Sequence, residues 1–127
     1  MKISISSDRG FTLIEVMTAV LILTVGLLGL LQAVNVAMEH NLKNRLRDTG
    51  VMIGEQQINS LVKMPIDTAI TNRYTTVTAV SGAIQKPYRV ERTKEDITSD
   101  SVRYRVNVQW TFKNRTTNHE VIAVNSR

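Results

Sequence analysis

The sequence has no cysteine, two prolines and two histidines among its 127 residues, and aromatic residues make up only 5% of it. Without cysteine there is no disulfide framework, no thiolate metal site and no cysteine nucleophile. The histidines, His40 and His119, lie far apart in sequence, which argues against a histidine-based metal or catalytic site. A glycine-rich phosphate loop and a carboxylate cluster are missing too. We therefore predict no enzymatic activity, no metal and no cofactor.

Charge is missing from the stretch between Val16 and Met38, although the whole chain carries a formal net charge of +5. Apolar residues dominate from Phe11 to Met38, and Glu15 is the one charged residue there. A helix of about 28 residues is about 42 Å long, which exceeds a hydrocarbon core of about 30 Å. A membrane-spanning helix is therefore predicted. A cleavable secretory signal is the alternative, but the run is too long for one and no clear small-x-small site follows.

Glu15 is out of place in such a helix. A charge in the apolar part of a membrane helix costs about 2.5 to 3.5 kcal/mol on insertion scales, so such residues usually have a partner. The segment contains no basic residue to pair with it. Either Glu15 stays near the interface, hydrated or protonated, or its partner comes from processing or from another chain.

Residues 9–16 read RGFTLIEV. This motif resembles the class III signal of type IV prepilins and type II secretion pseudopilins, in which a short basic leader ends in Gly and the mature chain begins with Phe and has Glu at its fifth position. The resemblance implies cleavage between Gly10 and Phe11 by a prepilin peptidase, followed by N-methylation of Phe11. It also implies that Glu15 neutralises the terminal amine of a neighbouring subunit during assembly.

The helical pattern continues beyond the membrane segment in amphipathic form. Apolar residues recur as far as Met64 at steps that are sums of three and four, and Pro65 provides a stop. We therefore expect one helix from about Phe11 to Met64, with Gly26 and Gly29 as places where it could unwind. The expected segments are a cleaved leader (1–10), a transmembrane or filament-core helix (11–38), its amphipathic continuation (39–64) and a small β-sheet head (65–127).

The head shows the two-residue period of strands. It is clearest from Val102 to Phe112, where apolar and polar residues alternate without exception. Glu120 to Val124 is its predicted hairpin partner across a polar connection at 113–118, weaker strands are expected at 74–80 and 88–92, and 93–101 is expected to be an exposed loop. The predicted fold class is α+β and pilin-like: a long N-terminal helix packed on an antiparallel sheet of three or four strands.

A finer resemblance covers most of the chain. The apolar opening, the GEQQINSL segment and the VRYRVNVQWTF…EVIAV hairpin pattern look like PilV-type minor pilins, and the related I-type minor pseudopilins of type II secretion are similar. This resemblance implies a subunit at or near the pilus tip that helps to prime filament assembly. The implied partners are other pilins or pseudopilins, prepilin peptidase, the inner-membrane assembly platform and the lipid bilayer. The implied location is the bacterial inner membrane with a periplasmic head, and later the filament.

Two alternatives remain open. One is a minor pseudopilin of a type II secretion system. The other, from a different class, is a single-pass anchor with a ligand-binding or DNA-binding head, which would not be cleaved after Gly10. A basic, aromatic surface is conceivable at Tyr88, Arg89, Arg92, Lys94, Arg103, Tyr104 and Arg105. A solvated strand face explains the same residues, and we do not expect a nucleic-acid partner.

Overall fold

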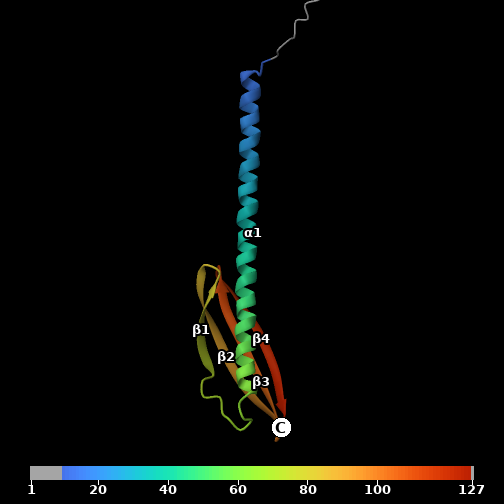
Figure 1. Cartoon of the computed structure of the whole chain (residues 1–127), viewed down its shortest axis with the longest axis vertical. Helices are drawn as coiled ribbons and strands as arrows, with labels where there is room; N and C mark the ends of the chain where they lie inside the picture. The colour runs from blue at the N-terminus through green and yellow to red at the C-terminus, as the bar shows by residue number, and fades with distance from the viewer. Residues whose placement is uncertain (1–9, 127) are drawn as a thin grey trace, which may run out of the picture. The chain divides into compact units, whose positions relative to one another are not determined.

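The computed structural model describes residues 10–126, so residues 1–9 of the expected leader lie outside the described residues. It has one long helix, α1 (Leu13–Val62), and four strands, β1 (Tyr74–Ser81), β2 (Ile84–Thr98), β3 (Ser101–Phe112) and β4 (Arg115–Ser126) (Figure 1). The chain separates into two compact units, one ending at Glu39 and the other beginning at His40. The expected α+β arrangement of a long apolar N-terminal helix and a small antiparallel sheet is confirmed.

The four strands form an antiparallel meander in the order β1-β2-β3-β4. The β3–β4 connection is shorter than expected, because the strands are joined by Lys113 and Asn114 alone, with φ of 46° and 61°. Two successive positive φ values are typical of the two-residue I′ hairpin turn, whose twist matches that of the strands. The predicted polar connection over 113–118 is therefore wrong at its C-terminal side, where 115–118 belong to β4.

The expected loop at 93–101 is also wrong. Residues 93–98 continue β2, with Thr93 opposite Arg105 and Glu95 opposite Arg103. This part of the strand lacks apolar alternation, so the period gave no signal. Its backbone is instead held by the β3 ladder, and the Arg103 guanidinium contacts Glu95 at 3.2 Å across the two strands.

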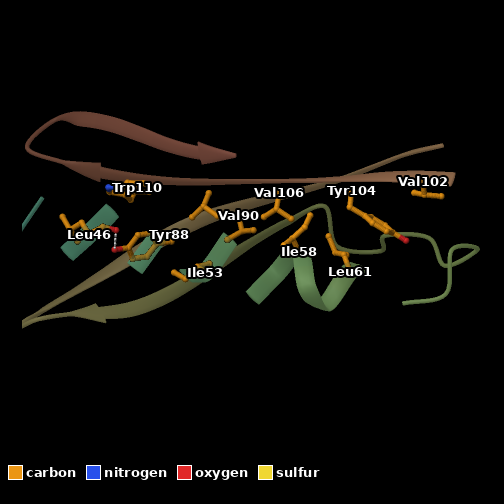
Figure 2. Packing of buried hydrophobic residues seen from close by; sticks show 11 residues of the cluster. Leu46, Ile53, Ile58, Leu61, Tyr88, Val90, Val102, Tyr104, Val106 and Trp110 are labelled. Carbon is orange, nitrogen blue, oxygen red and sulfur yellow. Dashed lines mark hydrogen bonds between the residues drawn. The ribbon is translucent and has the colours of Figure 1, made fainter. Parts of the chain in front are cut away.

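The core of the second unit lies between one face of the sheet and residues 40–62 of α1. Alternate residues of β3 from Val102 to Trp110 are buried, as the period-2 pattern predicts. Figure 2 shows the labelled Val102, Tyr104 and Val106 on the side of β3 that faces the helix. The buried hydrophobic side chains are Leu46, Ile53, Ile58 and Leu61 from α1, Tyr88 and Val90 from β2, and Val102, Tyr104, Val106, Val108 and Trp110 from β3.

Side chains from the sheet hold the end of α1 and the segment after it. The Asn125 amide donates a hydrogen bond to the Val62 carbonyl at 3.0 Å. The Lys94 ammonium donates to the carbonyls of Ile66 and Thr68. Helix carbonyls in the last turn lack partners within the helix. These long-range bonds therefore fix where the helix ends and where the chain turns towards β1.

Candidate functional site

The N-terminus of α1 carries the residues of the predicted processing and assembly site. Gly10 is exposed, and a Cβ placed on it would meet nothing within 4 Å. Phe11 is 83% exposed. Gly10 and Phe11 precede the helix, which begins at Leu13, so the bond between them lies in non-helical chain. An exposed peptide bond in non-helical chain, next to a residue without a side chain, is accessible to a peptidase.

Thr12 starts the helix, a role that the sequence reasoning missed. The Glu15 backbone N–H donates to the Thr12 hydroxyl at 3.3 Å, so Thr12 satisfies one of the amides that a helix N-terminus leaves free. The spacing Thr-x-x-Glu is that of a capping box, which was the available signal in the sequence. Glu15 consequently sits in the first turn, where a carboxylate interacts favourably with the helix dipole.

Glu15 is exposed, and within residues 10–126 no cation pairs with it. It is also the one charged residue between Phe11 and Met38. The interpretation that its partner comes from outside this stretch of the chain therefore still stands. The helix dipole offsets only part of the cost of placing a carboxylate in an apolar environment, because such interactions contribute about 0.3–1 kcal/mol.

The helical stretch after Glu15 is an apolar surface. By length and composition α1 can cross a membrane, and none of its most apolar window is buried. Large side chains such as Leu13 (79%) and Leu23 (62%) are mostly exposed. Such a continuous apolar surface requires lipid or other apolar helices around it.

The polar side chains of this stretch are satisfied locally. The hydroxyls of Thr18 and Thr24 donate to the carbonyls of Ile14 and Val20, each at 2.7 Å. Hydroxyls bonded in this way add no unpaired donor to a membrane. The helix is continuous through Gly26 and Gly29, and a Cβ at either position would meet nothing within 4 Å.

The basic, aromatic surface considered from the sequence does not exist as one surface. Tyr88 and Tyr104 are buried in the core, so their rings are unavailable for stacking on bases. Arg92 and Lys94 have the same parity on β2 as Tyr88 and share its face, whereas Arg89 lies on the opposite one. On that outer face, Arg103 pairs with Glu95 and Arg105 with Glu120 (3.6 Å). The structure therefore gives no support to a stacking platform for nucleic acid.

The histidines are apart in space as well as in sequence. His40 is exposed on α1, whereas His119 is half-buried on β4 beside Gly54. Within residues 10–126, no three residues of the types His, Cys, Asp and Glu are grouped as metal ligands.

Comparison with known families gives a match at the N-terminus. Residues 5–31 match the model of the prokaryotic N-terminal methylation motif. Neither the curated proteins nor the solved structures give a significant match. The motif supports membership of the type IV pilin and pseudopilin superfamily, whose subunits are structural, and it fits anchoring in the inner membrane. It also implies processing by a prepilin peptidase and assembly with other pilins.

Proposed function

We propose that the chain is a minor type IV pilin, cut after Gly10, methylated at Phe11 and assembled through its N-terminal helix at or near the pilus tip, where it helps to prime the filament. The observation that carries the proposal is the coincidence of the methylation motif with Glu15 as the single charge in the apolar segment. The two features are complementary. Cleavage would create a cationic amine at Phe11, and Glu15 is a carboxylate that has no cation partner within residues 10–126.

The energetics favour docking between subunits. A lone carboxylate in hydrocarbon costs about 2.5 to 3.5 kcal/mol on insertion scales, and a lone terminal amine is also a charge in an apolar environment. A filament that brings the Phe11 amine of one subunit to Glu15 of another neutralises both charges. Since removing one member of a buried pair costs about 3–5 kcal/mol, this contact selects the register in which subunits add.

The assignment to a minor subunit rests on the head. From Pro65 onward it has 63 residues and no cysteine, so no disulfide closes it. Its core consists of one sheet face and residues 40–62 of α1, with outer edges at β1 and β4. A head of this size has room for few surface elaborations. This favours a specialised subunit present in few copies over the main building block.

The same chemistry would serve a minor pseudopilin of a type II secretion system, and GEQQINSL and the β3–β4 hairpin resemble both classes. The two functions differ in what is lost when the gene is deleted. A minor pilin is required for surface filaments, whereas a minor pseudopilin is required for release of secreted proteins. Counting surface filaments and measuring secreted protein in one deletion strain separates them.

The direct test is intact-mass and N-terminal analysis of the protein purified from membranes of its own host. We expect a mature chain that begins at Phe11 and carries one added methyl group. A chain that still begins at Met1 in cells with active prepilin peptidase would show a plain membrane anchor and overturn the proposal. The same preparation from a peptidase-deficient strain is the control, since there the uncut chain must accumulate.

A further inference from the structure

The hydrogen-bonded ladder between β2 and β3 leaves out the first residues of β2 and the last residues of β3. Its pairing begins at Arg89 opposite Gln109, so Ile84–Tyr88 pair only with β1 and Trp110–Phe112 only with β4. Pro87 lies in this part of β2 and has no N–H to donate. Figure 2 shows the strands moving apart near the labelled Tyr88 and Trp110. The sheet therefore opens at this end.

The opening is a hollow of about 430 Å³. The hollow is lined by all four strands, and its lining includes Lys86, Arg89, Gln109, Trp110, Thr111 and Thr116. The Lys86 ammonium reaches across the gap to the Thr111 carbonyl, at a long 3.5 Å. The hydroxyls of Thr111 and Thr116 lie 3.3 Å apart on neighbouring strands. A volume of this size is within the range of small-molecule sites.

The charges of the hollow are of one sign. Two cations line it and no carboxylate does. Three other arginines of the head have acidic partners, with Arg73 on Glu91 at 2.9 Å and Arg103 and Arg105 paired as described above. Within residues 10–126, by contrast, Arg89 has no ion pair and no side-chain hydrogen bond. Its guanidinium is therefore available to a ligand.

The sheet register surrounds Arg89 with neutral polar groups. Thr76 of β1 and Gln109 of β3 lie directly opposite Arg89, one on each side. Threonine hydroxyls and the glutamine amide donate as well as accept, so they can pair with hydroxyl groups of a ligand. A guanidinium offers two parallel N–H donors that match the two oxygens of a carboxylate.

We propose that this hollow binds a small hydroxylated carboxylate, with Arg89 holding the carboxylate, Lys86 as the second cation and the threonine hydroxyls and Gln109 pairing with the ligand's hydroxyls. The site goes beyond the proposed assembly function and does not depend on it. The proposed cleavage after Gly10 lies just before α1, whereas the hollow lies in the head. Failure of one proposal can therefore be told from failure of the other.

Trp110 provides the measurement, since it is the one tryptophan in the sequence and lines the hollow. The probes are D-glucuronate and D-glucose, which differ at C6 by a carboxylate against a hydroxymethyl group. Each is titrated into the full chain in detergent micelles at constant ionic strength. We expect a saturable change in Trp110 fluorescence with glucuronate and none with glucose.

Variants locate the binding. Arg89→Gln should weaken glucuronate binding at least about tenfold, and Arg89→Lys, which keeps the charge but loses the planar fork, should bind with intermediate affinity. Arg103→Gln is the matched control, an arginine on the same face outside the hollow, and should bind like wild type. Because Arg89 is exposed, its replacement should not unfold the head, and far-UV circular dichroism checks this.

The shift of the Arg89 Nε–H signal in NMR spectra of the wild-type chain is the second readout, and it should saturate at the same concentrations as the fluorescence. Several results would overturn the proposal: no saturable response to glucuronate, an equal response to glucose, or unchanged affinity in Arg89→Gln. A response to inorganic phosphate without one to glucuronate would also overturn it, since the hollow would then recognise a different oxyanion.

Discussion

Gly50 of α1 lies directly against the ring of Trp110 on β3. A Cβ placed on Gly50 would be 2.6 Å from Trp110 Cζ3 and 2.9 Å from its Cε3. Both residues are buried, and the Trp110 ring also contacts that of Tyr88, with centroids 5.8 Å apart. The ring is therefore held from two sides, and helix and sheet approach closely here only because Gly50 has no side chain.

We predict that Gly50→Ala destabilises the head by about 1–3 kcal/mol, because overpacking outweighs the helix propensity that alanine adds. Gly54→Ala is the control one turn along. Its Cβ would be 3.1 Å from Val121 Cγ2, the tip of an aliphatic side chain, and the change should be close to neutral. Urea unfolding of the full chain in micelles, followed by Trp110 fluorescence, measures both. Equal stability of the two variants would contradict the assigned contact.

The Tyr88 hydroxyl donates a hydrogen bond to the Leu46 carbonyl at 3.1 Å inside the core (Figure 2). Tyr88→Phe should therefore cost about 0.5–1.5 kcal/mol at neutral pH. Tyr104→Phe is the matched control, because the buried Tyr104 hydroxyl has no hydrogen-bond partner in the described structure. That substitution should be neutral or slightly stabilising. The same urea unfolding assay compares them, and an equal cost for both would argue against the Tyr88 bond.

The same residue predicts a dependence on alkaline pH. Burial raises the pKa of the Tyr88 hydroxyl above its ordinary value of about 10, and interaction with the Thr49 side chain lowers the pKa by less. The unfolded chain therefore loses this proton first. The contribution of Tyr88 to stability is complete below about pH 10 and is lost as the pH rises through the folded-state pKa. The difference in unfolding free energy between wild type and Tyr88→Phe should shrink across that range.

Lys94 is predicted to hold the segment between α1 and β1. Its ammonium donates to the Ile66 and Thr68 carbonyls and lies 3.7 Å from Asp96. Lys94→Met keeps the aliphatic stem and removes these bonds, so backbone amides of 63–73 should exchange with solvent faster. Lys86→Met is the control on the same strand. Hydrogen exchange followed by mass spectrometry checks this, and unchanged exchange at 63–73 would show that the carbonyls are held without Lys94.

The fold was predictable where the alternation of buried and exposed positions is visible as a period in the sequence. Alternation from Val102 to Phe112 identified β3 because every second residue meets α1. Residues 93–98 have no such alternation, since their strand conformation depends on pairing with β3 residues that are distant in sequence. The two-residue period also argues against the basic surface. It places Arg92 and Lys94 on the face of the buried Tyr88 and Arg89 on the opposite face, so residues that are close in sequence do not form one surface.

The two candidate sites differ for the same reason. Gly10, Phe11 and Glu15 could be proposed as a site from eight consecutive residues, because a peptidase reads a local segment. The hollow beside Arg89 could not, because it requires the register of four strands and the ladder interruption at Pro87. No sequence pattern distinguishes Arg89 from the paired arginines Arg103 and Arg105.

Gly10→Val should block processing, because a branched side chain replaces the hydrogen at the position that precedes the cleaved bond. Uncut protein should accumulate in the membrane. Gly26→Val is the control, since this position is open on all sides within α1 and tests whether valine in the apolar segment disturbs insertion. N-terminal sequencing of both variants gives the answer. Cleavage of Gly10→Val before Phe11 at the wild-type level would contradict the role assigned to Gly10.

Glu15→Ala and the isosteric Glu15→Gln should leave cleavage intact but reduce incorporation into filaments at least about tenfold. Losing about 1.4 kcal/mol is enough for a tenfold effect, and breaking a buried charge pair costs about 3–5 kcal/mol. Glu55→Gln removes an exposed carboxylate from the helix within the head and should assemble normally. Immunoblots of sheared filaments and of membranes measure both pools. Because removing the charge also makes membrane insertion easier, a shortage in filaments together with a normal or increased membrane pool locates the defect in docking. Wild-type incorporation of both Glu15 variants would show that the carboxylate has no role in assembly.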